Sequence, residues 1–439
     1  MAMVVKNNMS ALSTLNTLNK NTKALSKSLQ KVSSGMKINS AADDASGYAI
    51  SERMRVQIRS LDQANSNAQN GGSMMKVAEG AVSSTVEILK TLKEKAVNAA
   101  NDTNTDADRQ TIQKELDQSI DQINDNANVT FNGQYLVDGS KNSATKATCT
   151  ALTNQSLAED TASNTALTAL KARNNDSLNI QSTDTITVSW VKDGKTYTAS
   201  TLVGSKTLND ALNAMEDGTA KLSESITLSG GKSSFIAVDG SGNSVYTASG
   251  ESSISITSKG TGIEGQISGF TISITDNTGA VRKSANAALD AFDETLRAQN
   301  KSDDNSINLQ VGTKANQTIK VGLTDMKAQA LGLQGKNNDT IQVGNQEQAN
   351  AAINVLDAAI QKALDQQTTI GAVQSRLEYT QSNLTTASEN VTAAESTIRD
   401  ADMAKEMTEY TKNNVLMQAA QSMLAQANQS SSNVLSLLQ

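Results

Sequence analysis

The chain divides into three stretches according to the spacing of its hydrophobic residues. Up to about Asn128, and again from about Gln346 onward, hydrophobic residues recur at alternating steps of three and four. This spacing places them on one side of a helix. Between these stretches, hydrophobic and polar residues alternate in short runs that end at glycine-containing turns, which is typical of β-strands. The sequence therefore predicts two helical ends that enclose a β-rich insert.

The first predicted helix carries one narrow hydrophobic stripe surrounded by polar residues. Such a helix should press its stripe against another helix, as in a coiled coil. Ser33-Ser34-Gly35 should interrupt this helix, and residues 39–47 should form a loop. The members of the stripe are Leu15, Leu18, Thr22, Leu25, Leu29, Val32 and Met36.

Two more helices and a hairpin complete the N-terminal stretch. A polar turn at residues 101–106 separates the helices, and residues 129–136 should form a hairpin around Asn132-Gly133. The longer helix has its stripe at Leu61, Ala64, Ala68, Gly71, Met75, Ala78, Val82, Thr85, Leu89, Leu92, Ala96 and Ala99; the shorter one has Ile112, Leu116, Ile120 and Ile123.

The C-terminal stretch repeats the pattern without a break. Many positions in its stripe are Ala, Thr or Gly, which let helices approach closely but bury little area, so association should supply the stability. After Asp400, hydrophobic residues spread more widely around the helix, which indicates more than one neighbour. The stripe contains Leu356, Ala359, Ala363, Gln366, Ile370, Val373, Leu377, Thr380, Leu384, Ala387, Val391, Ala394, Ile398 and Ala401.

The insert should consist of short strands. Residues 186–190 lead into the turn Asp193-Gly194, and residues 235–238 precede a second turn before Val245-Tyr246. Residues 254–256 and 270–274 follow the same alternation, and a last pair of strands is predicted at 307–311 and 319–323. The expected fold is mostly α, with long coiled-coil-like terminal helices forming a rod and a solvent-facing β-rich domain in the middle.

The composition removes most sources of catalytic chemistry. The chain has no His and only one Cys, Cys149, so it lacks the commonest proton-transfer group and metal ligand and cannot build a thiolate zinc site. Lys and Arg number 38 against 45 Asp and Glu, with no long basic run, which argues against nucleic acid. No stretch reaches the roughly 18 apolar residues of a membrane span. We expect no catalytic site, no cofactor, no metal and no membrane partner.

Two segments at opposite ends resemble one known family. Residues 29–49, LQKVSSGMKINSAADDASGYA, resemble the N-terminal signature of the bacterial flagellins. Residues 423–439, MLAQANQSSSNVLSLLQ, are similar to the C-terminal signature, and residues 307–312 and 370–374 match as well. The resemblance covers roughly residues 1–140 and 305–439 and does not extend to the insert.

The resemblance implies a structural subunit that polymerises into the flagellar filament. By analogy, residues 1–44 and 401–439 would form the inner filament core, 45–140 and 306–400 the two halves of the rod domain, and 141–305 the variable surface domain. The assembly seams would be Leu15, Leu18, Leu25, Leu29, Val32, Leu377, Leu384, Val391, Ile398, Val434, Leu435, Leu437 and Leu438.

The resemblance also implies the chain's partners and location. The chain would be secreted to the flagellum by the export apparatus without a cleaved signal peptide. It would bind copies of itself, a chaperone at its C-terminal segment, and hook-associated and cap proteins. A hook-filament junction protein is the alternative, although the ending NVLSLL and the loop DDASGY favour flagellin. An enzyme hosted in the insert, as in rare flagellins with a metalloprotease, would need H-E-x-x-H, and the chain has no His.

One departure from the family concerns recognition by a vertebrate innate immune receptor. The family segment resembles L-x-R-x-x-E-L-A-V-x-x-A-N, whereas this chain has LKTLKEKAVNAAN at residues 89–101. Thr91 and Lys95 replace the Arg and second Leu of the family, while Glu115 is retained. Losing the planar guanidinium and an apolar contact should weaken receptor signalling. The candidate receptor-facing residues are Leu89, Thr91, Lys95 and Glu115.

Overall fold

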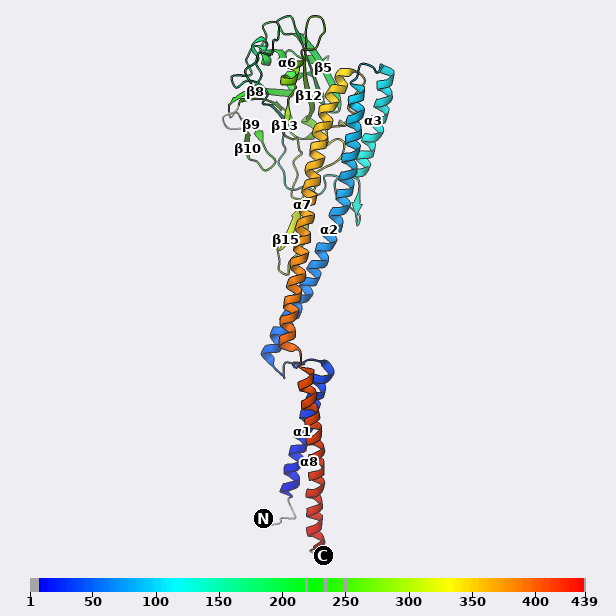
Figure 1. Cartoon of the computed structure of the whole chain (residues 1–439), viewed down its shortest axis with the longest axis vertical. Coiled ribbons are helices and arrows are strands. Elements are labelled where there is room, and N and C mark those ends of the chain that lie inside the picture. Colours follow the sequence, from blue (N-terminus) through cyan, green and yellow to red (C-terminus); the bar gives the residue numbers. More distant parts are fainter. Residues whose placement is uncertain (1–7, 218–219, 233–234, 248–251, 438–439) are drawn as a thin grey trace. The chain divides into compact units, whose positions relative to one another are not determined.

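The computed structural model describes residues 8–217, 220–232, 235–247 and 252–437 (Figure 1). The predicted fold is confirmed: long helices at both ends of the chain enclose a β-rich middle. Contacts divide the chain into two compact units. The first unit contains the described residues up to Ala68, Gln310–Gln317, and the described residues from Tyr379 onward. The second contains Gln69–Leu309 and Thr318–Glu378, as far as these are described.

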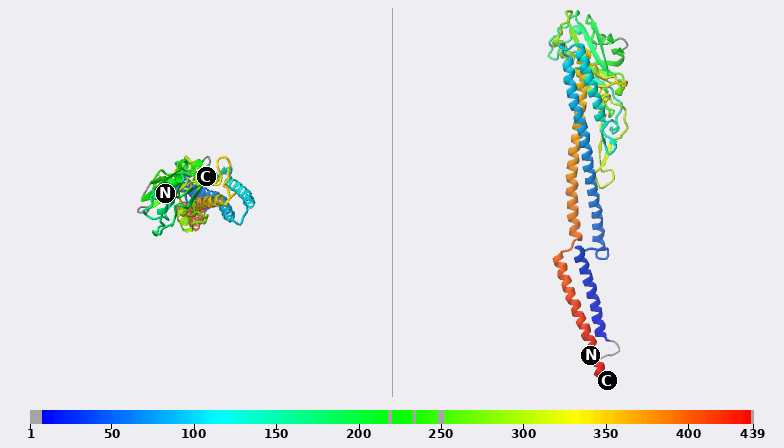
Figure 2. Two further views of the ribbon diagram at one scale, coloured as in Figure 1. Left: turned by 90° about the horizontal axis from the view of Figure 1, so that it is seen from above. Right: turned by 90° about the vertical axis from the view of Figure 1, so that its right-hand side faces the viewer.

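In the first unit, α1 (Met9–Ser34) and α8 (Met403–Leu437) lie side by side (Figures 1 and 2). Polar contacts show that the two helices run in opposite directions. The Nδ2 of Asn21 donates to the carbonyl of Leu416 at 3.2 Å, and the Nζ of Lys31 lies 3.2 Å from the Oε1 of Glu406. The predicted break after Ser33-Ser34 is confirmed, because α1 ends at Ser34.

The other helices that cross the first unit are α2 (Ala45–Ala99) and α7 (Gln346–Arg399). Within this unit they share a small core of Leu61, Ala64 and Leu384. The predicted loop at residues 39–47 is wrong at its end, since α2 begins at Ala45. The physical reason is a cap: the Oδ1 of Asp44 accepts hydrogen bonds from the backbone N–H groups of Ser46 and Gly47, both at 3.0 Å.

Arg399 holds together the segments that follow α1 and precede α8. Its guanidinium is buried, donates from Nη1 to the Oε1 of Glu52 at 2.6 Å and from Nε to the sulfur of Met36 at 3.1 Å, and lies 5.5 Å from the ring of Tyr48. The backbone N–H of Lys37 donates to the carbonyl of Arg399 at 2.8 Å. We call this group of contacts the Arg399 junction.

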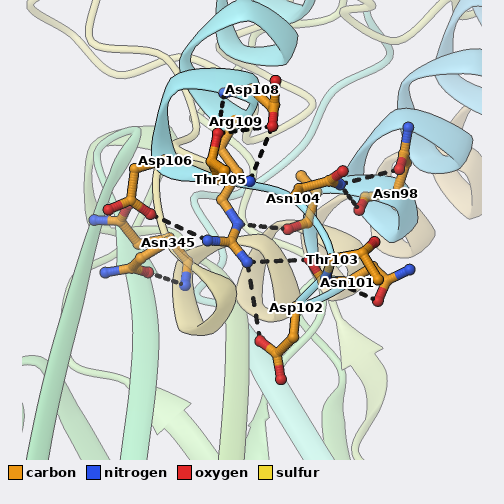
Figure 3. A network of polar contacts seen from close by, with 12 residues as sticks. Asn98, Asn101, Asp102, Thr103, Asn104, Thr105, Asp106, Asp108, Arg109 and Asn345 are labelled. Atoms are coloured by element: carbon orange, nitrogen blue, oxygen red, sulfur yellow. Dashed lines mark hydrogen bonds and ion pairs between the residues drawn. The ribbon is translucent and has the colours of Figure 1, made fainter.

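In the second unit, α3 (Asp106–Ala127) follows α2 after a tight turn (Figure 3). Thr105 and Asp108 form a capping box that starts the helix. Arg109 is buried, and its Nε donates to the carbonyl of Ala99 at 2.8 Å while Nη2 donates to the carbonyl of Asn101 at 3.1 Å. Arg109 thereby satisfies carbonyls that the end of α2 leaves without helical partners.

The predicted helical stripes are confirmed by burial in α2 and α3. Every predicted stripe position from Leu61 to Ala99 is buried, as are Leu116, Ile120 and Ile123 of α3. After α3, β1 (Thr130–Phe131) and β2 (Gln134–Tyr135) form the predicted hairpin.

The insert contains two antiparallel sheets and several short elements. The four-stranded sheet has the order β13-β3-β11-β8 and the three-stranded sheet the order β12-β4-β5. Their bounds are β3 (Ala151–Asn154), β4 (Thr185–Lys192), β5 (Lys195–Leu202), β8 (Ile226–Lys232), β11 (Ser252–Ser258), β12 (Ile267–Thr275) and β13 (Asp293–Leu296). The remaining elements are η1 (Leu167–Ala169), α4 (Leu208–Asn213), β6 (Glu216–Asp217), β7 (Ala220–Lys221), α5 (Leu222–Ser225), β9 (Phe235–Val238), β10 (Ser244–Tyr246), η2 (Ile263–Gly265), α6 (Lys283–Leu289), β14 (Ile307–Gln310) and β15 (Thr318–Val321).

Both larger sheets contribute to one hydrophobic core. Trp190 and Ile256 come from different sheets and belong to the same buried cluster. Phe270 is buried in this cluster and meets Phe292 edge to face, with ring centroids 5.2 Å apart. The strands predicted from alternation are confirmed, including the pair β4 and β5 around Asp193-Gly194.

The insert packs against α7 and bonds to the loop that precedes α7 in the second unit. A Cβ at Gly269 of β12 would lie 2.6 Å from Val355 on α7, so only glycine allows this close approach. Next to it, the Nδ2 of Asn354 donates to the carbonyl of Phe270 at 3.2 Å. At the β4–β5 turn, the Oδ1 of Asp193 accepts from the backbone N–H of Lys336 at 2.6 Å.

Replacement of a stripe residue should unfold the helices of the second unit more easily. Leu92 is 1% exposed and Val97, on the same helix, is 51% exposed. Leu92→Ala should lower the free energy of unfolding by about 2–5 kcal/mol, because it leaves a cavity. Val97→Ala should change it by less than about 0.5 kcal/mol. Urea unfolding followed by circular dichroism measures both, and equal effects would contradict the assigned core.

The Arg399 junction should weaken in acid. The hydrogen bond from Arg399 holds the pKa of Glu52 below its ordinary value of 4.5. A carboxylate whose pKa is lowered by folding stabilises the folded chain above its unfolded pKa, and that contribution is lost as the pH falls through the folded pKa. Glu52→Gln should therefore lower the melting temperature near neutral pH, and the difference from the unchanged chain should shrink below pH 4.5.

The matched control for this pH dependence is Glu389→Gln. Glu389 is an exposed residue of the same helix as Arg399. This variant should melt with the unchanged chain at every pH. A constant difference between Glu52→Gln and the unchanged chain across the same pH range would show that Glu52 is not the titrating group.

Candidate assembly surfaces

One side of α1 faces α8 and is more polar than the sequence predicted. The Nδ2 of Asn413 on α8 donates to the Oγ of Ser28, which is buried, at 3.1 Å. Leu18, Leu25 and Val32 lie near this side and are half-buried. Ser28 was missed because a search for hydrophobic spacing passes over a small polar residue, although its step of three from Leu25 fits the helical period.

A second side of α1 has large hydrophobic side chains that the described residues leave about half exposed. Leu15 and Leu29, both predicted seam residues, are exposed in the single chain, as is Leu12. Leu12 and Leu29 keep 52% of their surface exposed. The hydrophobic stripe of α1 is therefore wider than the area that α8 covers.

Helix α8 shows the same division into covered and uncovered sides. Ala420 and Ala427 are buried, and Leu424 is half-buried. On other sides Met403, Met407, Val415, Leu416 and Met423 are exposed. The predicted seam residues Val434, Leu435 and Leu437 have side chains outside the described part of the structure, and Leu438 lies beyond the described residues altogether.

The remaining predicted seam residues lie on α7. Leu377 and Leu384 are buried, while Val391 and Ile398 are half-buried. These positions therefore pack mostly within the chain itself. Their assignment as contacts between copies stays a prediction, as does the division of the chain at residues 44, 140, 305 and 400.

The predicted receptor-facing residues do not all reach the surface. Leu89 is completely buried, so its assignment to a receptor-facing surface is wrong: it has the helical phase of Thr85 and Leu92, which are also buried. Thr91 is exposed. The Nζ of Lys95 lies 2.9 Å from the Oε2 of Glu115, so the retained carboxylate forms an ion pair within the chain.

Over the ranges described, no three or more His, Cys, Asp or Glu side chains gather in a way that could hold a metal ion. Cys149 is half-buried, and burial raises the pKa of its thiol, which disfavours the reactive thiolate. Among the described helices, none has an apolar stretch long enough to span a membrane.

Comparison with known proteins gives two family matches and full-length relatives. Residues 5–142 match the bacterial flagellin N-terminal helical region, and residues 353–438 match the C-terminal helical region. A flagellin of Clostridium tyrobutyricum is 36% identical over 431 residues, covering 97% of this chain and 99% of the relative. A flagellin of Bacillus subtilis is 32% identical over 439 residues, covering 99% and 100%.

A solved structure of flagellar hook-associated protein-3 from Legionella pneumophila aligns with a TM-score of 0.35 at 16% identity, over 78% of this chain and 97% of that one. That likeness is too slight to bear on the function. The relatives, in contrast, share about a third of their residues along their whole length, and both family regions lie at the expected ends. The chain therefore belongs to the bacterial flagellin family, the structural subunits of flagellar filaments.

Proposed function

We propose that this chain polymerises into the flagellar filament through the uncovered sides of α1 and α8. The observation that supports the proposal is the exposure of large hydrophobic residues on both helices after they have paired with each other. Leu12 and Leu29 on α1 and Met423 on α8, which is 59% exposed, are the clearest cases. Contiguous exposed apolar residues on a folded protein mark surfaces that contact another molecule.

The free energy gained by burying these side chains in a neighbouring copy is of the size that a polymer requires. Covering a half-exposed leucine in a neighbouring copy removes about half its apolar surface from water, which is worth about 1 kcal/mol. Each such contact is weak, but several of them repeat at every subunit. Since the faces of α1 and α8 differ, the contacts join unlike surfaces, and such contacts extend into an open helical array when they do not close a ring.

The exposed hydrophobic residues of α8 also support the proposal of a chaperone partner. A free α8 with uncovered methionines would bind unwanted neighbours, which supports the proposal that a chaperone masks the C-terminal segment before export. We infer from the family resemblance that export to the extracellular filament proceeds without a cleaved signal peptide. Contacts with hook-associated and cap proteins at the filament ends are proposed on the same ground.

We also propose that the chain signals weakly through the vertebrate innate immune receptor for flagellin. The support lies at Lys95, which occupies a position that is apolar in the family segment and engages Glu115 at 2.9 Å. A receptor would have to break this ion pair to reach the carboxylate. Thr91 offers one hydroxyl in place of the guanidinium of the family, and that hydroxyl already donates to the carbonyl of Glu87 at 3.1 Å.

Removing three exposed hydrophobic side chains of α1 should slow filament growth. The triple variant Leu12→Gln, Leu15→Gln and Leu29→Gln should slow seeded polymerisation of the full chain at least tenfold, because three contacts of about 1 kcal/mol each are lost. Light scattering and electron microscopy measure the growth. The free chain should keep its helix content, since these side chains do not belong to its core.

The matched control keeps the three leucines and changes exposed polar residues of the same helix, namely Asn16, Lys20 and Lys23, each to Gln. It should polymerise as the unchanged chain does. Normal growth of the triple leucine variant would contradict the proposed surface. If the unchanged chain only capped existing filaments and never extended them, the hook-filament junction alternative would replace the proposal.

Restoring the family residues at two positions should strengthen receptor signalling. The variant Thr91→Arg with Lys95→Leu adds a planar donor, adds an apolar contact and frees Glu115 from its ion pair. A receptor-dependent reporter assay should show a lower half-maximal concentration than for the unchanged chain, by about tenfold or more. Lys90→Leu, at the residue directly before Thr91 in the sequence, serves as the control, and equal potency of all three proteins would refute the assignment.

A further inference from the structure

Two groups of like-charged side chains on this chain have no ion-pair partner among the described residues. Elsewhere on the surface, charged side chains often have a neighbour of opposite sign, as Lys90 has Glu87 at 2.8 Å and Lys93 has Asp357 at 2.5 Å. One patch consists of Arg59 and Lys314, which we call the cationic tip. The other consists of Asp117, Asp121 and Asp125, which we call the aspartate stripe.

The cationic tip lines a groove of about 550 Å³ between α2 and the loop that joins β14 to β15. Arg59 stands on α2, and Lys314 stands on the loop. No acidic residue lines the groove. Within the part of the chain that the structure describes, neither Arg59 nor Lys314 forms an ion pair, so both positive charges remain available to another molecule.

The loop that carries Lys314 is held in shape by its own backbone contacts. The Nε2 of Gln310 donates to the carbonyl of Lys314 at 2.7 Å, and the backbone N–H of Lys314 donates to the Oε1 of Gln317 at 3.0 Å. These bonds occupy the backbone and leave the ammonium group of Lys314 free. The neighbours Thr313 and Ala315 are small, so the loop presents one long charged side chain at a narrow tip.

The aspartate stripe follows one side of α3, where its members are spaced by four residues. Like charges at this spacing destabilise a helix. Asp117 and Asp121 line a groove of about 510 Å³ between α3 and residues 334–340. The Oδ1 of Asp117 accepts hydrogen bonds from the Oγ1 of Thr340 at 2.6 Å and from the Nε2 of Gln113 at 2.8 Å, whereas Asp121 and Asp125 are exposed. No described lysine or arginine forms an ion pair with any of the three, even though Lys114 lies on the same helix.

We propose that the cationic tip of one copy of this chain docks on the aspartate stripe of a second copy. A narrow tip with a free ammonium group fits a groove lined by two carboxylates, and Arg59 adds a second positive charge beside it. The two patches differ from each other, so one copy can offer its tip to a second and its stripe to a third. Such head-to-tail contacts extend a polymer, whereas a contact between identical patches would close a dimer.

This inference rests on the proposed polymerisation and adds to the hydrophobic contacts a charged contact that selects the register between copies. Complementary charges guide association and disfavour wrong pairings, because like charges repel each other. The side chains of Lys314 and Arg59 form no hydrogen bond or ion pair with any residue that the structure describes. Lys also has a higher helix propensity than Asp, so charge reversal on either patch should leave the fold intact.

Seeded polymerisation of the full chain with reversed charges tests the contact. The tip variant, Arg59→Glu with Lys314→Glu, and the stripe variant, Asp121→Lys with Asp125→Lys, should each elongate at least about tenfold more slowly than the unchanged chain. A chain that carries both sets of changes presents an anionic tip and a cationic stripe. It should regain most of the lost elongation rate.

The matched control is Lys283→Glu with Lys206→Glu, which reverses two charges on the insert and should elongate normally. Circular dichroism should show the same helix content for every variant. Normal elongation of the tip and stripe variants would overturn the proposal, and so would a combined variant no faster than the slower of the two. Failure of the unchanged chain to polymerise would instead count against the proposed function.

Discussion

The contact between the two ends of the chain is the constraint on which the first unit depends. α1 and α8 each have few large residues on the sides that face each other, with Ser28 and Ala420 buried at the contact. Helices in proteins owe most of their stability to the packing of one face, so this contact has little hydrophobic area with which to stabilise either helix. At the Arg399 junction, backbone bonds from Lys37 to Arg399 and from Ala401 to Gly35, at 2.8 and 2.9 Å, fix the register of both ends at once.

The insert is held against the rest of the second unit by several specific contacts. Gly269 brings β12 against α7, and the β4–β5 turn is held by the backbone N–H of Lys336. The Nη1 of Arg297, at the end of β13, also lies 2.5 Å from the Oδ2 of Asp365 on α7. The three-stranded sheet is thus held by α7 and by the loop that contains Lys336, and the four-stranded sheet is held by α7 through Arg297. Both sheets keep a fixed orientation within the second unit, so change is easiest on their outer loops.

Hydrophobic periodicity predicted most of the fold. The stripe of α2, the helix α3, the turn Asp193-Gly194 and the strands around it follow directly from spacing and turn chemistry. Buried polar side chains could not be found in this way: Arg109 and Arg399 are surrounded by carbonyls, carboxylates and a ring that only the folded chain brings together.

The error at Leu89 came from carrying a surface over from a family segment without applying the helical phase. The exposure of Leu15 and Leu29 could not be predicted either, since spacing shows which side of a helix is hydrophobic but not how much of that side a partner covers.

Hydrogen bonds between α8 and the segment of α1 with its cap join residues that are nearly 400 or more positions apart in the described chain. Asn8 and Ala427, linked at 3.2 Å, are 419 positions apart. Contacts of such separation form late in folding, because the intervening chain must first be brought together. A chain that emerges gradually, from either end, cannot make them until nearly its whole length is available. The pairing of the outermost helices is therefore completed only when the chain itself is nearly complete, and a shortened copy would lack the α1–α8 pair.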